Sequence, residues 1–157
     1  MITRTSRRTR HLAACAACLG AGLTLAAPAY AALGDIAAPV AGAATRTLAG
    51  GAASVVRYVD AGGTTIDEYV ATANGEIFAY AWQGPTMPNV QVMLGRYAAS
   101  YQTGAAALLA AQRGDLHAGR VERPDVVVET GGQMRSYVGR AWLPVALPAG
   151  VSKGDLR

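Results

Sequence analysis

The stretch that most constrains this chain runs from Asn74 to Pro85, because it predicts a strand with no polar face. Asn74-Gly75 suits the positive φ angles of a tight hairpin turn, Glu76 to Trp82 is rich in aromatic and apolar residues, and Gly84-Pro85 ends the strand. Alternation places Phe78, Tyr80 and Trp82 on one face and Ile77, Ala79 and Ala81 on the other. Such a strand belongs in the middle of a sheet that is covered on both sides.

Two further segments precede this strand and predict a three-strand antiparallel meander. Ser54 to Val59 is β-prone and Asp60 to Gly63 is a turn cluster. Thr64 to Val70 alternates, with Ile66, Glu68 and Val70 opposite Asp67 and Tyr69. Asp67 and Glu68 are adjacent, so on a strand they point to opposite faces.

A helical period follows and then a second hairpin. Apolar residues recur at helical spacing from Asn89, a good N-cap, to about Arg113. We expect this helix to bend or break near Gly104, where it could also approach the sheet closely. Residues 115–123 read as a polar loop. Val126 to Thr130 and Gln133 to Leu143 then predict two strands joined by a tight turn at Gly131-Gly132.

These elements predict an α+β fold. Its small antiparallel sheet consists of the three-strand meander and the second hairpin, with the long helix on one face. We expect the helix, through Leu94, Tyr97 and Tyr101, to cover the face of Phe78, Tyr80 and Trp82. The segment Leu143 to Val151 is expected to cover Ile77, Ala79 and Ala81 on the other face, and the competing cover is a second copy of the chain or a partner.

The first 31 residues have the form of an export signal. Four arginines precede an uncharged apolar run from Leu12 to Ala27, and Ala29-Tyr30-Ala31 supplies the small residues that signal peptidase requires, which places cleavage between Ala31 and Ala32. The alternative is a retained membrane anchor, but the run falls short of the roughly 20 residues needed to span a bilayer. The signal predicts a periplasmic or secreted protein with no membrane span in the mature chain.

Removing this leader changes the charge of the chain. The leader holds four of the fourteen basic residues and no acid, so ten basic and ten acidic residues remain. The basic pI therefore belongs to the leader and does not indicate nucleic-acid binding. Both cysteines also lie in the leader, so the mature chain has no disulfide. We expect a signal peptide at 1–31, a flexible lead-in at 32–53, a single α+β domain at 54–151, and a polar tail at 152–157.

Candidate catalytic residues are few. His117 is the one histidine outside the leader, and a hydrolase would need it as a base, with Asp115 or Asp125 to orient it and a serine nucleophile. The candidate nucleophiles are Ser54, Ser100 and Ser136. None of them lies in a nucleophile-elbow pattern, so a solvated histidine is the simpler interpretation.

The sequence predicts no metal or cofactor. One histidine and no cysteine exclude zinc sites built from several such ligands. Glu122, Asp125 and Glu129 could offer oxygen ligands to calcium, but they lack the spacing of a calcium loop. The glycine pairs join strand to strand and no helix follows them, which excludes phosphate loops.

The aromatic row of Phe78, Tyr80 and Trp82 is a candidate ligand or partner surface, as is the shallow strip of Ile77, Ala79 and Ala81. The aromatic row could stack on a sugar polymer. An aromatic row beside an amphipathic helix is more commonly part of the core.

Several short motifs together resemble an uncharacterised family of exported Gram-negative proteins, domain of unknown function 2844. They extend through almost the whole mature chain: Ala32-Leu33-Gly34, Ala81-Trp82-Gln83-Gly84-Pro85, Leu94-Gly95, Gly131-Gly132-Gln133-Met134-Arg135, Gly139-Arg140-Ala141 and Leu147-Pro148-Ala149-Gly150-Val151. The resemblance implies export and a single domain, and it implies no activity.

Three functions remain open from the sequence. The one we favour is a non-catalytic binding or interaction module of the periplasm or cell envelope that acts on a protein or polymer partner. The others are a small periplasmic hydrolase that uses His117 and a secreted inhibitor or accessory factor, the latter by analogy of shape.

Overall fold

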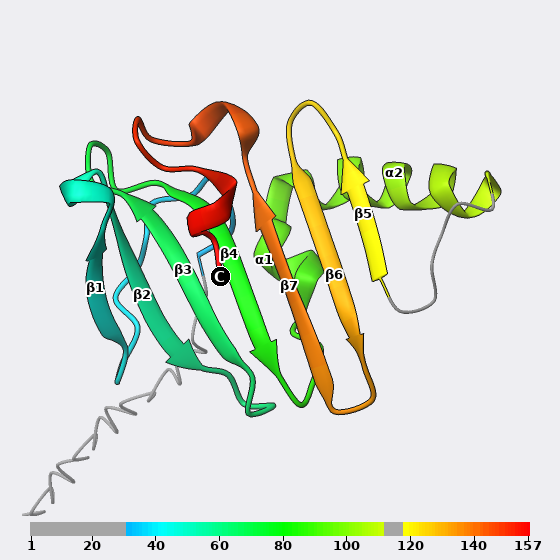
Figure 1. Ribbon diagram of the computed structural model, residues 1–157, viewed down its shortest axis with the longest axis horizontal. Helices are drawn as coiled ribbons and strands as arrows, with labels where there is room; N and C mark the ends of the chain where they lie inside the picture. Colours follow the sequence, from blue (N-terminus) through cyan, green and yellow to red (C-terminus); the bar gives the residue numbers. More distant parts are fainter. Residues whose placement is uncertain (1–30, 112–117) are drawn as a thin grey trace, which may run out of the picture.

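The computed structural model describes residues 31–111 and 118–157. These residues form a seven-stranded antiparallel sheet in the order β1-β2-β3-β4-β7-β6-β5. Two helices lie against one face, and the C-terminal segment crosses the other (Figure 1). The strands are β1 (Ala44–Leu48), β2 (Ala53–Val59), β3 (Thr65–Ala71), β4 (Ile77–Gly84), β5 (Ala118–Glu122), β6 (Val127–Gln133) and β7 (Ser136–Trp142). The helices are α1 (Val90–Leu94) and α2 (Ala98–Ala110).

The predicted arrangement of a three-strand meander and a separate hairpin is wrong, although the α+β class and the antiparallel pairing hold. The sheet is continuous because β7 pairs directly with β4, from Ala79↔Trp142 to Gly84↔Tyr137. The sequence analysis also missed β1 and β5, which lie in the predicted lead-in and polar loop. Both are short edge strands with mostly exposed side chains, so they lack the apolar alternation that marks a strand.

The turn of the second hairpin lies three residues beyond its predicted position. β6 continues through Gly131 and Gly132, and the chain reverses at Met134-Arg135, where Arg135 has a positive φ of 65°. Gly132 is required for packing, since a Cβ at this position would lie 2.1 Å from the carbonyl oxygen of Ser136.

A β-bulge decides which residues of β4 share a face. Tyr69 pairs with Ala79 and Val70 pairs with Ile77, so Phe78 has no partner in β3. Strict alternation is therefore right for Tyr80, Trp82, Ala79 and Ala81 and wrong at the bulge. Ile77 joins the cluster on the helix face, and Phe78 joins the cluster on the opposite face.

The helices cover the β4 face that carries Tyr80 and Trp82, as expected, with Leu94 buried and Tyr97 and Tyr101 packed around it. Asn89 caps α1 by accepting a hydrogen bond from the Val92 amide. The predicted single helix is interrupted at Gly95, which adopts φ 50° and ψ −118°, and the chain continues through a 3-10 turn (Gly95–Tyr97) into α2. The helix does not bend at Gly104. That glycine instead marks the close approach to the sheet, since a Cβ there would lie 2.5 Å from Val121 of β5.

The N-terminal segment covers the rest of the helix face. Leu33 is fully buried, and its amide donates to the Met93 carbonyl of α1 at 2.8 Å. The Gly34 amide donates to the Ile77 carbonyl, and the Ile77 amide donates to the Asp35 carbonyl. Residues 32–53 were predicted to be a flexible lead-in, but the structure places core contacts and strand β1 within this range.

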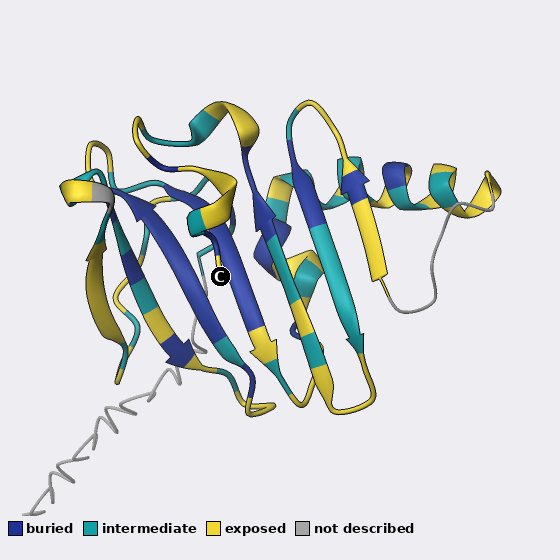
Figure 2. Ribbon diagram, in the orientation of Figure 1, coloured by how far each residue is buried: buried dark blue, intermediate teal, exposed yellow. Residues whose placement is uncertain are grey.

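The C-terminal segment covers the opposite face, as predicted from the apolar character of residues 143–151. Val151 belongs to the same core cluster as Phe78 and Ala79, and Leu147 packs against this cluster. The buried Leu156 extends the cover into the predicted polar tail. The backbone amide of Arg157 donates to the Tyr69 hydroxyl, which anchors the end of the segment on β3. Figure 2 shows that β3 and β4 are buried along most of their length.

We predict that Trp82→Ala destabilises the protein by about 3–5 kcal/mol, as is usual for a truncated core aromatic. Trp82 is 2% exposed, and Gly139 lies against its indole ring. Within the described residues its Nε1 has no hydrogen-bond partner, so its contribution is packing. Trp82→Phe should therefore retain most of the stability in urea unfolding. Equal losses in the two variants would contradict this explanation.

Candidate functional site

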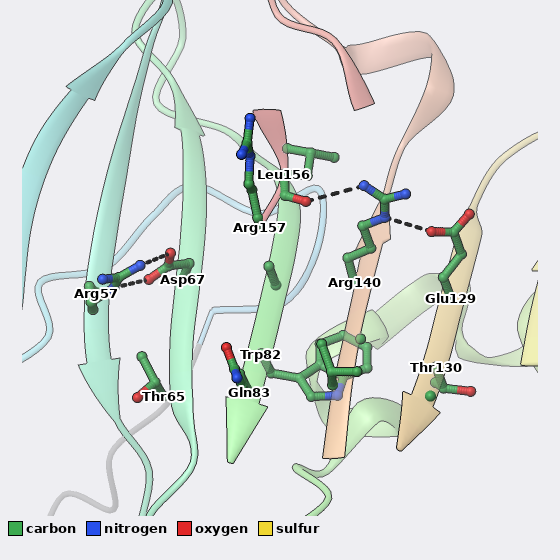
Figure 3. A pocket seen from close by; sticks show the side chains of 14 residues that line it. Arg57, Thr65, Asp67, Trp82, Gln83, Glu129, Thr130, Arg140, Leu156 and Arg157 are labelled. Atoms are coloured by element: carbon green, nitrogen blue, oxygen red, sulfur yellow. Dashed lines mark hydrogen bonds and ion pairs between the residues drawn. The ribbon is translucent and has the colours of Figure 1, made fainter. Parts of the chain in front are cut away.

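A groove of about 590 Å³ lies on the face of the sheet opposite the helices. It extends across the ends of β2, β3, β4, β7 and β6 that the C-terminal segment leaves uncovered (Figure 3). Alternation along these strands directs charged or polar side chains onto this face, and the longest one from each strand lines the groove. These residues are Arg57, Asp67, Gln83, Arg140 and Glu129.

One wall of the groove is an ion pair between neighbouring strands. Arg57 of β2 lies opposite Asp67 of β3 and donates from Nε and Nη2 to the two carboxylate oxygens, both at 2.6 Å. This bidentate hydrogen bond raises the pKa of Arg57 above its ordinary value. Asp67 is almost fully buried, whereas Arg57 is about half exposed and faces solvent. The guanidinium therefore has N–H groups left with which to bind a ligand.

The other wall is formed by Glu129 of β6 and Arg140 of β7. Arg140 donates from Nε to Glu129 at 2.6 Å and from Nη1 to the backbone carbonyls of Lys153 and Leu156. Glu129 also pairs with Arg120 of β5. The Arg140 and Arg120 guanidinium groups lie over the Trp142 ring, 5.3 and 5.9 Å from its centroid. Ion pairs and ring contacts hold this wall in place.

Small residues form the floor between the walls. Ala81, Gly131 and Gly139 line it, and Gly139 leaves the space that the Trp82 ring fills from below. Polar groups stand around this floor, namely Gln83, Thr65, Thr130 and Arg157. The arrangement can hold an extended polar chain between two fixed ion pairs.

The candidate surface predicted on β4 is part of the core. The six side chains of Phe78, Tyr80, Trp82, Ile77, Ala79 and Ala81 are all buried, and of these Ala81 and Trp82 line the groove. The sequence analysis gave Arg57, Gln83 and Arg140 no role in a site, although Gln83 and Arg140 lie in the family motifs. Each of them is a polar residue in a strand whose neighbouring positions are core residues. This signal identifies a shared site only once the order of the strands is known.

Of the residues considered for catalysis, the described part of the chain brings together Ser100 and Asp125. His117 and Asp115 lie outside the described residues. The Ser100 hydroxyl contacts Asp125 at 2.7 Å, which ties α2 to the segment between β5 and β6. Residues 31–111 and 118–157 contain no group of three His, Cys, Asp or Glu side chains that could hold a metal ion. No helix in these ranges is long and apolar enough to cross a membrane.

A second polar site is buried on the helix face of the same strands. Glu68 is 2% exposed, and its Oε1 has no hydrogen-bond partner within the described residues. The Tyr80 hydroxyl faces two acceptors, the Ala31 carbonyl at 2.6 Å and Glu68 Oε2 at 3.1 Å. The Tyr80 hydroxyl has one proton and can donate to only one of these two oxygens. If it donates to the Ala31 carbonyl, a protonated Glu68 can donate to the hydroxyl oxygen, and both contacts are then hydrogen bonds. Burial raises the pKa of Glu68, which agrees with this arrangement.

Comparison with known proteins gives one match. A model of the family described as "Protein of unknown function (DUF2844)" matches residues 15–156. No curated protein and no solved structure matches the chain.

In the chain in which residue 31 is still linked to Ala32, we predict that stability falls as pH rises because of Glu68. Glu68→Gln should remove this fall. Because the folded pKa of Glu68 is raised, its contribution is fully present below the unfolded pKa of about 4.3 and is lost as pH rises through the folded pKa. Each unit between the two pKa values corresponds to about 1.4 kcal/mol.

The check is urea unfolding of both proteins from about pH 5 to 8, the range above the unfolded pKa. The free energy of unfolding of the parent should fall relative to that of the variant as pH rises. A constant difference across this range would show that Glu68 is ionised in the folded state.

Proposed function

The chain belongs to the DUF2844 family, and we propose that it is an exported, non-catalytic binding module of the cell envelope. In this proposal residues 1–31 direct export and are removed, and the groove between the Arg57–Asp67 and Arg140–Glu129 pairs binds an extended polypeptide segment of an envelope partner. The observation that carries the binding role is the groove itself: charged and polar side chains from five strands converge over an open, small-residue floor.

The chemistry of the groove favours a polypeptide over a sugar polymer. A floor of alanine and glycine lets a backbone approach the sheet closely, and guanidinium, carboxamide and hydroxyl groups match the hydrogen-bonding groups of peptide and polar side chains. Trp82 beneath the groove is 2% exposed, and Trp142 under the Arg120 and Arg140 guanidinium groups is 4% exposed. Neither offers the open ring face on which a sugar would stack.

The arginine of each groove wall is paired with a carboxylate, so the walls should attract neither anionic nor cationic ligands strongly. Arg57 and Arg140 are each held by a carboxylate, so the walls are rigid before a ligand arrives. A site built in this way needs little reordering on binding, which lowers the entropic cost of association.

We expect Val138→Arg to abolish binding, because Val138 lines the groove opposite Gln83 and is 50% exposed, so a long cationic side chain there fills the groove without entering the core. Val92→Arg is the matched control, since Val92 is also 50% exposed but lies on α1 against the other face. Binding is read by placing a photocrosslinking amino acid at position 83 in cells and identifying the adduct by mass spectrometry.

A protein adduct that forms in the Val92→Arg background and falls at least about tenfold in the Val138→Arg background, a loss of about 1.4 kcal/mol, is the expected result. The melting temperatures of both variants should match that of the parent. An adduct that Val138→Arg leaves unchanged would remove the groove from the proposal. A glycan adduct at position 83 would replace the polypeptide as occupant.

A further inference from the structure

The predicted cleavage position lies inside a built site of the fold. Ala31 and Ala32 flank the bond, and both of its sides are engaged: the Ala31 carbonyl accepts from Tyr80, and the Ala32 amide donates to Asp35 at 3.2 Å. The next residue, Leu33, is fully buried and bonded to α1. A peptidase needs this segment extended and free, so cleavage has to precede docking of residues 31–35.

Ala32, the residue on the mature side of the bond, occupies a closely fitted position on the fold, which we call the Ala32 seat. The Ala32 side chain rests on Gly95, where a Cβ would come within 2.5 Å of it. Gly34 has a φ of 82° and packs against the Tyr97 ring. Arg96 bonds both the Gly34 carbonyl, at 3.0 Å, and Asp35, at 2.5 Å, and so fixes the carboxylate beside the Ala32 nitrogen.

Hydrolysis changes the charge at this seat. Water adds across the Ala31–Ala32 bond: its hydroxyl group goes to the Ala31 carbonyl carbon, which leaves with the leader, and a proton goes to the Ala32 nitrogen. The new acid passes its proton to the new amine at neutral pH, so Ala32 carries an α-ammonium group. This nitrogen lies within about 5 Å of the Tyr80 hydroxyl, two bond lengths from the carbonyl oxygen that the hydroxyl contacts.

We propose that the α-ammonium of Ala32 is a structural cation of the mature protein, held by Asp35 and by the Tyr80–Glu68 pair. In the chain with residue 31 attached, Glu68 is buried with one oxygen unpartnered among the described residues. Loss of the Ala31 carbonyl frees the Tyr80 hydroxyl, and the ammonium supplies the positive charge that a buried carboxylate requires. Removal of the leader would thus turn a destabilising acid into one half of an ion pair.

Titratable side chains from several elements surround this seat. Asp35, Arg96 and Tyr97 lie around residues 32–35, with Glu76 near Arg96. Glu68 and Tyr80 lie on the buried side, with Tyr58 near Tyr80. Asp35 already pairs with Arg96, whose guanidinium lowers the pKa of that carboxyl. Glu68 is the carboxyl group of this set whose charge state the ammonium would change most.

The inference depends on the proposed cleavage site, so the test uses protein with a defined N-terminus. Chains that begin at Ala32 are prepared with a free amine or with an acetylated amine. The acetyl carbonyl stands where the Ala31 carbonyl stood and keeps the Tyr80 hydrogen bond. Both forms are made with Glu68 and with Glu68→Gln, and with Glu122→Gln as a surface control, since Glu122 lies on β5 and pairs with Arg120.

The expected result is an inversion of sign at pH 7. Glu68→Gln should lower the melting temperature of the free-amine form, because an ion pair is lost, and should raise that of the acetylated form, because an uncompensated acid is removed. Glu122→Gln should act alike in both. The free α-amine should also titrate above the range of about 7.7–8.0 of an ordinary α-amine. Equal effects of Glu68→Gln in the two forms would overturn the proposal.

The intact mass of the exported protein distinguishes an error in the proposed ammonium site from an error in the proposed cleavage site. A mass that begins at Ala32, together with equal effects of Glu68→Gln, shows that the cleavage site is right and the ammonium site wrong. A mass that begins elsewhere shows that the exported protein has no α-ammonium at Ala32, which overturns the inference for the natural protein while leaving the groove test unaffected.

Discussion

Burial of both faces of β4 is the constraint on which the rest of the structure depends. Its side chains are apolar on either side, so a sheet covered on one face alone would leave a long hydrophobic strip in water. The helices and residues 31–43 cover one face, and residues 146–156 cover the other. Segments from both ends of the described chain thus meet across the same strand, and β7, which leads into the C-terminal cover, is paired to it directly.

The two faces of this sheet give neighbouring acids opposite roles. Asp67 and Glu68 are adjacent in β3 and both are nearly inaccessible. Asp67 faces the groove, where Arg57 compensates its charge. Glu68 faces the helices, where a tyrosine hydroxyl is its one neighbour in hydrogen-bonding distance among the described residues. Burial raises the pKa of Glu68 for lack of a cation, and the proposed α-ammonium of Ala32 is the cation that this face would gain on processing.

Local signals in the sequence were sufficient for the central elements and insufficient for the arrangement around them. The strands β2, β3 and β4 and the Asn89 cap follow from alternation and capping, and the adjacency of Asp67 and Glu68 correctly placed them on opposite faces. The bulge at Phe78 could not be predicted, because it depends on pairing with β3. The β4–β7 pairing joins residues about sixty positions apart, and no local pattern encodes it. The groove depends on that pairing, so its residues could not be recognised before the strand order was known.

Hydrogen exchange of the β4 amides tests most directly the claim that both ends of the chain cover this strand. The full chain is compared with one that ends at Leu143 and so lacks Leu147, Val151 and Leu156. Loss of even one buried leucine costs about 2–5 kcal/mol, so exchange of the β4 amides should become at least about thirtyfold faster in the shortened chain. Unchanged exchange of these amides would contradict the account, because the C-terminal segment would then cover nothing that the fold requires.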